Sequence, residues 1–177
     1  MANILVVTGS VRPNSVNSKI VPLVVSALEA RGDVATVANL GELNLPFIDT
    51  PILPADENFT PPHENVQRWT NMIASADGVV LVTPEYNHTL SPIQLNAIDW
   101  VGKDWAGKPV VFIGYGWTSG GGQAHATARE ALAEVLKANV GEVQANLFFA
   151  KDIAPDGSVI DKERVDEKIN AALQTLS

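Results

Sequence analysis

Short apolar runs alternate along the chain with stretches in which apolar residues recur every three or four positions. A run such as Ile4-Leu5-Val6-Val7 is short enough to be a strand buried on both faces of a parallel sheet. The intervening spacing is typical of helices that cover such a sheet with one apolar face. Strands are therefore expected at residues 4–7, 33–40, 78–83, 108–114 and 143–149, and helices at residues 20–28, 62–76, 93–101, 123–139 and 165–176.

This alternation predicts an α/β fold in which helices cover both faces of a five-stranded parallel sheet. The length of 177 residues favours one domain, residues 1–177. Residues 41–62 interrupt the pattern, because they hold five prolines and show no periodicity. We expect them to form a long surface loop, either as part of a site wall or as a plain connection over the edge of the sheet.

Composition narrows the class of protein. The hydrophobic share is 46% and the charged share is 18%, as in globular proteins. No apolar run reaches the ~18 residues of a membrane-spanning helix. No export signal precedes the first strand, so a cytoplasmic protein is expected. Cysteine is absent, which excludes disulfides and thiolate chemistry. The net charge of −8 argues against nucleic acid or a membrane surface as a partner.

Three segments directly follow predicted strands, at residues 9–17, 84–90 and 114–122. The carboxyl ends of parallel strands share one edge of the sheet, and ligands bind in the crevice there. We therefore expect the three loops to form one site. The first loop combines hydroxyl and amide side chains with Arg12 ahead of a helix, which favours binding of a phosphate. The same residue types also occur in ordinary turns and helix caps, so the loop alone leaves both interpretations open.

Two other phosphate-binding motifs are matched only in part. Residues 102–108 have the spacing of a P-loop, but Pro109 follows where a hydroxyl should hold Mg²⁺, and the segment precedes a strand. Residues 114–119 resemble the GxGxxG fingerprint of dinucleotide-binding folds, with Ser119 in the third glycine position. That fingerprint belongs in the first strand–helix unit and needs an acidic residue at the end of the next strand. Neither motif is expected to function.

Side chains suited to acid–base or metal chemistry are few. No GxSxG nucleophile elbow is present, and the spacing of His63, His88 and His125 does not suit a metal site. All three histidines are expected at the surface, and no metal is expected. Glu85 offers a general acid or base, but its position after Pro84 favours a role in orienting its loop through hydrogen bonds.

Five aromatic residues fall near the proposed crevice. Aromatic rings can flank a flat ligand, bury a subunit interface or pack in the core. Tyr86, Tyr115 and Trp117 are the candidates for the walls around a flat ring. Trp100 is assigned to packing or to an interface, and Trp105 is expected near the same surface.

Taken together, these residues resemble the NADPH-dependent FMN reductase family, which includes quinone, azo-dye and chromate reductases. The resemblance spans residues 1–140 and implies a flavodoxin-like three-layer sandwich, with a five-stranded parallel sheet in the order 2-1-3-4-5. It rests on three motifs in the family's order: Gly9-Ser10-Val11-Arg12 with Ser15 and Asn17, then Thr83-Pro84-Glu85-Tyr86-Asn87, then Asn96-Ala97-Ile98-Asp99-Trp100 with Gly107-Lys108-Pro109.

The resemblance also implies a cofactor, flavin mononucleotide (FMN), bound without a covalent bond. In the family, its phosphate is held by the residues that match Ser10, Arg12, Ser15, Val16 and Asn17. Its isoalloxazine ring is lined, largely through backbone groups, by the residues that match Pro84, Glu85, Tyr86 and Asn87. The Gly-rich loop closes the other side of the ring, here with Gly114, Tyr115, Gly116, Trp117 and Ser119.

The implied function is transfer of a hydride from NADPH or NADH to FMN, followed by reduction of a quinone, free flavin or similar small acceptor. The flavin carries this chemistry, so no catalytic side chain is assigned. The resemblance also implies a homodimer or a dimer of dimers, with the aromatic surface near Trp100 and Trp105 at its interface.

Two departures from the family pattern keep other functions open. Ser91-Pro92-Ile93-Gln94-Leu95 stands where the family has Pro-Gly-x-Leu-Lys, whose lysine often serves the subunit interface. Gln123 or Ala124 stands where the family tends to carry an arginine, which leaves the choice between NADPH and NADH open. The alternatives are a flavodoxin-like electron carrier and a flavin-free structural or regulatory relative.

Overall fold

A computed structural model describes residues 1–176; Ser177, the last residue of the predicted domain, lies outside the described residues. Strands and helices alternate along most of the chain, as predicted. In order, the elements are β1 (Asn3–Thr8), α1 (Asn17–Ala30), β2 (Val34–Ala38), α2 (Leu40–Leu43), α3 (Glu64–Ser75), β3 (Gly78–Pro84), α4 (Pro92–Asp99), the 3₁₀ turn η1 (Lys103–Trp105), β4 (Pro109–Gly116), α5 (Gly122–Arg129), the π-helical turn η2 (Glu130–Val135), β5 (Asn139–Val140), β6 (Ala145–Phe148) and α6 (Lys162–Leu173).

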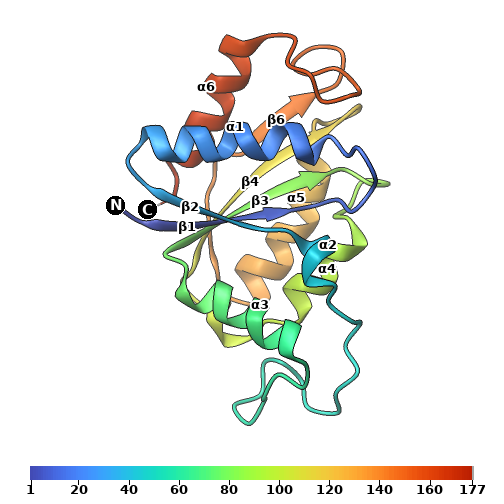
Figure 1. Ribbon diagram of the computed structural model, residues 1–177, viewed down its shortest axis with the longest axis vertical. Coiled ribbons are helices and arrows are strands. Elements are labelled where there is room, and N and C mark those ends of the chain that lie inside the picture. The colour runs from blue at the N-terminus through green and yellow to red at the C-terminus, as the bar shows by residue number, and fades with distance from the viewer. Residues whose placement is uncertain (177) are drawn as a thin grey trace.

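The strands form one parallel sheet in the order β2-β1-β3-β4-β5, with β6 also paired to β4. The predicted strand order is therefore confirmed. Figure 1 shows α1 and α6 on one face of this sheet and α3, α4 and α5 on the other, which makes three layers. No helix among residues 1–176 is long and apolar enough to cross a membrane.

Alternation within the strands divides the apolar residues between two cores, because successive side chains of a strand point to opposite faces. In β1, Ile4 and Val6 face the core under α1 and α6, whereas Leu5 and Val7 face the core under α3 and α4. The central strand β3 is buried along its whole length. A strand covered on both faces reads as a near-continuous apolar run, and the sequence shows such a run here at Val79-Val80-Leu81-Val82.

The fifth position of the sheet departs from the prediction. The strand expected at residues 143–149 pairs only over β6. A separate strand, β5, forms at Asn139, where the predicted helix was expected to end, and at Val140. Both pair with β4, and Gly141 follows the first of them. A Cβ at Gly141 would lie 2.3 Å from the Thr175 hydroxyl oxygen and 3.0 Å from Val111 Cγ1. The chain just after the end of α6 thus comes close to Gly141 at the break between the two short strands.

Two further boundaries were wrong. The short helix α2 begins at Leu40, the last residue of the expected strand, and continues into the segment expected to be a loop; Asn39 caps it by accepting a hydrogen bond from Gly41 N at 3.0 Å. The strand β4 continues two residues beyond its predicted end at Gly114, so Tyr115 and Gly116 belong to a strand and not to the expected loop.

The tryptophans Trp100 and Trp105 are buried, and this corrects the predicted interface. Neither is exposed to solvent, and both belong to the core under α3 and α4. Each indole N–H donates to a backbone carbonyl, from Trp100 to Pro46 O at 2.7 Å and from Trp105 to Ile98 O at 3.2 Å. A buried indole with its N–H paired serves packing, so these rings offer no surface to a second subunit.

Candidate functional site

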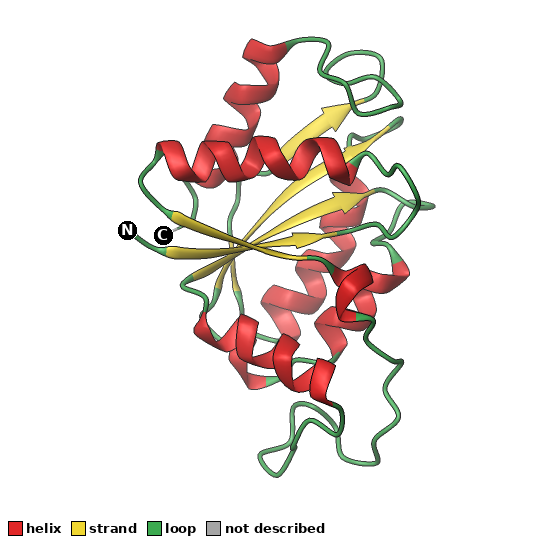
Figure 2. Cartoon of the chain, viewed as in Figure 1, coloured by secondary structure: helices red, strands yellow, loops and turns green. Residues whose placement is uncertain are grey.

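A cleft of about 360 Å³ opens at the carboxyl ends of β1, β3 and β4. Figure 2 shows the strand arrows pointing toward the loops at this end of the sheet. Four of the predicted site residues, Asn17, Asn87, Gly114 and Ser119, are not on the cleft wall, whereas the other predicted residues are. The wall consists of Ser10, Arg12, Ser15, Val16, Pro84, Glu85, Tyr86, Tyr115, Gly116, Trp117, Phe149 and Pro155.

The loop after β1 is held in shape from beneath by Asn17. This side chain is buried; its Oδ1 accepts from Gly9 N at 2.7 Å, and its Nδ2 donates to the Tyr115 hydroxyl at 2.6 Å. Asn17 thus ties the two ends of its own loop together and fastens the loop to β4. Both ends of its amide are engaged, so its contribution to the cleft is to fix the loop.

Several hydrogen-bond donors of the same loop remain free to meet a ligand. The backbone N–H groups of Val11, Asn14 and Val16 have no acceptor within residues 1–176. Arg12 is exposed, and its guanidinium makes no ion pair or hydrogen bond with the described residues. It is the only basic side chain on the cleft wall. This donor set, beside the N-terminus of α1, is chemically suited to a phosphate.

Glu85 joins the two other loops of the cleft. Its side chain is only 6% exposed, and its Oε2 accepts hydrogen bonds from the Ser119 hydroxyl and, at 3.2 Å, from Gln123 N. Its Oε1 lies 3.6 Å from His88 Nδ1. The carboxylate therefore clamps the loop after β3 to the loop after β4. This agrees with the interpretation that Glu85 orients its loop through hydrogen bonds.

The glycines of the third loop pack backbone against backbone. Gly121 has φ +98°, and a Cβ there would lie 2.4 Å from Gly114 Cα. In the reverse direction, a Cβ at Gly114 would lie 2.8 Å from Gly121 Cα. The loop thus folds back onto the end of β4, and the two glycines permit this contact. Gly114 lies beneath the loop and supports the wall of the cleft from behind.

Aromatic side chains form much of the cleft wall. Tyr86 exchanges a 3.1 Å hydrogen bond with the Ser10 hydroxyl. Burial raises the pKa of Tyr115 to about 12, although hydrogen bonds from Asn17 and Ser15 act in the opposite direction. Trp117 is 64% exposed at the rim, with its ring centroid 5.1 Å from that of Phe149. The three predicted ring-wall residues thus all line the cleft.

The sequence analysis missed Phe149 and Pro155, which follow β6 and line the cleft opposite the other loops. Their segment is anchored by Asp152, a carboxylate only 1% exposed. Burial alone would raise its pKa, but hydrogen bonds from Lys168, Phe148 N and Arg164 outweigh burial, and the pKa is lowered. These bonds are 2.8, 2.7 and 2.6 Å long. No local sequence pattern predicts Phe149 or Pro155 as wall residues. They line the cleft because their segment follows β6, which pairs with β4 in the folded chain.

The histidines lie apart from the cleft wall. His88 is exposed, as predicted, and His63 is half-buried beside Asp49, at 2.8 Å. The prediction for His125 was wrong, because this side chain is 8% exposed and packs edge-on against Phe112. The first helical turn of α5 faces the core at this position. Burial, aided by the nearby charge of Arg129, lowers the pKa of His125 to about 4.

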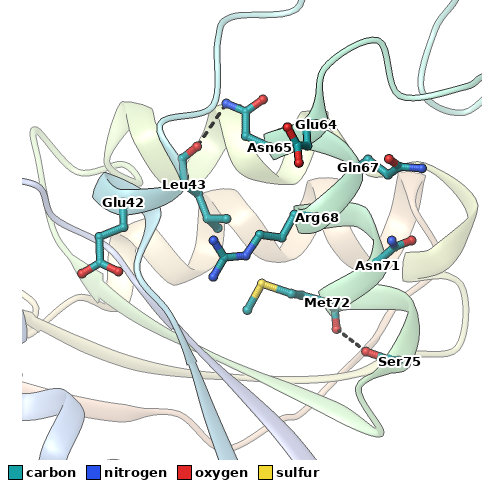
Figure 3. A pocket seen from close by; sticks show the side chains of 9 residues that line it. All are labelled: Glu42, Leu43, Glu64, Asn65, Gln67, Arg68, Asn71, Met72 and Ser75. Atoms are coloured by element: carbon teal, nitrogen blue, oxygen red, sulfur yellow. Dashed lines mark hydrogen bonds between the residues drawn. The ribbon is translucent and has the colours of Figure 1, made fainter.

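A larger hollow of about 640 Å³ lies on the surface over α2 and α3. Figure 3 shows Arg68 reaching across it between Leu43 and Met72, with Asn65 bonded to the Leu43 carbonyl. It contains no residue of the three converging loops. In an open parallel sheet, the switch point at the carboxyl edge is where ligands bind. We therefore assign the site to the smaller cleft.

Comparison with known proteins shows which family the chain belongs to. A family described as NADPH-dependent FMN reductase matches residues 2–151. A NAD(P)H-dependent FMN reductase from Nectria sp is 37% identical over 157 residues, which are 85% of this chain and 77% of the relative. The chain belongs to the NADPH-dependent FMN reductase family.

Two other relatives extend the comparison. A quinone reductase from Escherichia coli is 27% identical over 170 residues, which are 92% of this chain and 87% of the relative. The solved structure of FerB, a flavoenzyme NAD(P)H:(acceptor) oxidoreductase from Paracoccus denitrificans, matches with a TM-score of 0.78 and 26% identity. That match covers 99% of this chain and 96% of FerB. The FMN reductase family is one of oxidoreductases that use FMN with NAD(P)H as the electron donor.

Proposed function

We propose that this chain oxidises NAD(P)H and reduces a quinone, free flavin or similar small acceptor by way of FMN bound in the cleft at the carboxyl edge of the sheet. For a quinone, the balanced reaction consumes NAD(P)H, one proton and the quinone, and yields NAD(P)⁺ and the hydroquinone. Two electrons leave the nicotinamide, and two electrons with two protons reach the acceptor.

One observation carries this proposal: loops from three neighbouring strands meet at one cleft whose wall combines a donor set suited to a phosphate with aromatic side chains suited to a flat ring. The cleft volume of about 360 Å³ is within the range of small-molecule sites. The unpaired donors of the first loop suit the phosphate of FMN, and the Tyr and Trp side chains suit its flat ring. The residues present therefore fit the cofactor that the family uses.

We assign the phosphate to the loop after β1 and the ring to the two loops that Glu85 joins. The proposed phosphate residues are Ser10, Arg12, Ser15 and Val16, with Asn17 fixing the loop, and the proposed ring residues are Pro84, Glu85, Tyr86, Asn87, Tyr115, Gly116 and Trp117, with Gly114 and Ser119 in support. FMN, when bound, supplies the ability to accept a hydride and to release electrons to a second substrate. The chain's own residues bind and orient it, and no side chain is assigned as an acid or base.

The assembly and the compartment belong to the same proposal. We infer a homodimer or a dimer of dimers in the cytoplasm, with neither nucleic acid nor membrane as a partner. The net charge of −8 supports the exclusion of nucleic acid and of membrane surfaces as partners. The buried positions of Trp100 and Trp105 mean that any subunit contact has to use other side chains.

The experiment mixes purified protein with FMN and then with NADPH or NADH without oxygen, and follows the absorbance of the oxidised flavin and of the nicotinamide. We expect FMN to bind and its colour to bleach as the nicotinamide is oxidised, and oxidised colour to return when a quinone is added. Binding without bleaching would assign the chain to the electron carriers. Absence of FMN binding would assign it to the flavin-free relatives.

A further inference from the structure

The segment that joins β6 to α6, residues 149–161, contributes a fourth side to the proposed FMN cleft, and we call it the strap. Two of its residues, Phe149 and Pro155, line the cleft. Most of the strap and all of α6 lie beyond residue 151, where the match to the FMN reductase family ends. The role of this side of the wall therefore does not follow from the match.

The strap contacts two of the loops that build the cleft. At its start, Phe149 N donates to Gly116 O at 3.1 Å, and the ring centroids of Phe149 and Trp117 lie 5.1 Å apart. At its turn, a Cβ on Gly157 would lie 3.3 Å from Val16 Cα. The strap thus reaches from the end of β4 to the loop that offers the donors suited to a phosphate.

One buried carboxylate fastens the strap to α6. Asp152 is only 1% exposed. Its Oδ1 accepts from Arg164 Nε at 2.6 Å, and its Oδ2 accepts from Lys168 Nζ at 2.8 Å. Oδ2 also accepts from Phe148 N, at the end of β6, at 2.7 Å. Arg164 and Lys168 are four residues apart on α6 and so lie on the same side of the helix. Loss of this one charge would release both cations from the strap.

The bonds of Asp152 also fix the orientation of the strap. Asp152 O accepts from Ile160 N at 2.9 Å, and Ala154 N donates to Ser158 O at 2.8 Å, so the strap folds back on itself around the carboxylate. Ile153 is buried in the core under α1 and α6. That apolar contact has no preferred direction, whereas hydrogen bonds do. The orientation of the two cleft residues, each three positions from Asp152, therefore depends on the carboxylate.

We propose that Asp152 is a positioning residue of the FMN site, although it is not on the cleft wall. It holds the strap so that Phe149 and Pro155 close one side of the cleft, and it thereby slows release of the cofactor. This inference rests on the proposed function, since it concerns the same cleft. Phe149 and Pro155 have apolar side chains, which do not pair with a phosphate. Loss of Asp152 should therefore weaken FMN and riboflavin alike.

The test compares the full chain with Asp152→Asn, which keeps the size of the side chain and removes its charge. Binding of FMN and of riboflavin is measured by quenching of flavin fluorescence, and release of FMN is followed after rapid dilution. The matched control is Asp33→Asn. Asp33 also accepts from a backbone N–H, that of Ala2 at 3.1 Å, and pairs with Arg31 at 3.4 Å. It precedes β2 and so lies at the opposite edge of the sheet.

We expect Asp152→Asn to raise the Kd for FMN and for riboflavin about tenfold each, chiefly through faster release. Asp33→Asn should leave both constants unchanged. In a Phe149→Ala background, Asp152→Asn should have a much smaller effect, because a residue that acts through the strap then has less to position. Urea unfolding of each variant identifies conditions under which all of them are folded, and binding is compared there.

Unchanged Kd values in folded Asp152→Asn would overturn the inference, and so would effects of Asp152→Asn and Phe149→Ala that simply add. Weakening of FMN alone would place the effect at the phosphate and overturn it as well. If Asp152→Asn does not fold, Lys168→Met decides, because Lys168 is 30% exposed and methionine favours a helix. A raised Kd for both flavins in that variant supports the inference, and unchanged values overturn it.

The wild-type protein separates this inference from the proposed function. Wild-type protein that binds neither flavin would overturn the proposed function, and the role of Asp152 with it. Wild-type protein that binds FMN as tightly as the Asp152→Asn variant does would overturn the role of Asp152 alone.

Discussion

Arg12 supplies the positive charge of the proposed FMN cleft at the scale of single residues. It is the only basic side chain on that wall, in a chain whose net charge is −8. The overall field therefore repels an anion, and local donors have to hold it. The guanidinium has no partner among the described residues that would compete with a phosphate.

Replacement of Arg12 with alanine should weaken FMN binding by ~1.5–3 kcal/mol, the strength of a hydrogen bond to a charged group. Riboflavin has the same ring but no phosphate, so its Kd should barely change. Both constants can be measured by quenching of flavin fluorescence. Arg68→Ala is the matched control, because Arg68 is an exposed arginine on the hollow over α2 and α3. Equal weakening of FMN and riboflavin would show that Arg12 does not contact the phosphate.

The Gly-rich loop after β4 shapes the cleft at the scale of elements. Glu85 pulls this loop toward the loop after β3 by accepting from Ser119 and from Gln123 N. The backbone of Gly121 meanwhile rests on Gly114 of β4. The position of Trp117 at the rim of the cleft thus depends partly on the backbone contact between Gly121 and Gly114, in which neither residue has a side chain.

Gly121→Ala should destabilise the protein by ~2–4 kcal/mol, because a Cβ there combines a positive φ with a clash against β4. The control is Gly107→Ala, where φ is +71° but no atom lies within 4 Å of the added Cβ. That variant should lose only ~1 kcal/mol from the backbone conformation. Urea unfolding of both variants measures the difference. Equal losses would mean that the loop does not pack on Gly114 as described.

At the scale of the whole molecule, a histidine buried in one of the two cores makes the free energy of unfolding depend on pH. His125 packs against Phe112 in the core under α3 and α4, and its Nε2 has no hydrogen-bond partner among residues 1–176. Burial lowers its pKa from 6.5 to about 4. Between these two values the unfolded chain binds a proton that the folded chain does not, so the free energy of unfolding falls as the pH falls. The effect is complete below the folded pKa.

Wild-type protein should therefore lose about 2 kcal/mol of unfolding free energy between about pH 7 and about pH 5 through this residue. His125→Leu should abolish most of that loss, whereas His88→Gln, at an exposed position, should retain it. The measurement is urea unfolding at both pH values. The buried carboxylate of Asp152, whose pKa is lowered, adds its own loss only at more acidic pH, below the ordinary value of 3.8. An unchanged pH dependence in His125→Leu would contradict the assignment.

The sequence by itself predicted a parallel sheet and three loops at one of its edges. The order of the strands followed from the resemblance to the family. In a strand with one buried face, apolar residues recur every two positions, and in a helix with one buried face they recur every 3.6. The type of each element and its buried face can therefore be predicted from its own sequence. The residues of the loop after β1 and of Pro84-Glu85-Tyr86 were recognised because each set is contiguous in the chain.

Only the tertiary structure decided which side chains from distant segments meet. Phe149 and Pro155 join the cleft because β6 pairs with β4. Trp100 and His125 turn inward because their helices pack against the sheet. Asn17 reaches Tyr115, 98 positions along the chain, instead of the cleft. Such contacts depend on how whole elements lie against each other, and a local pattern of apolar and polar residues carries no information about its partner across the core.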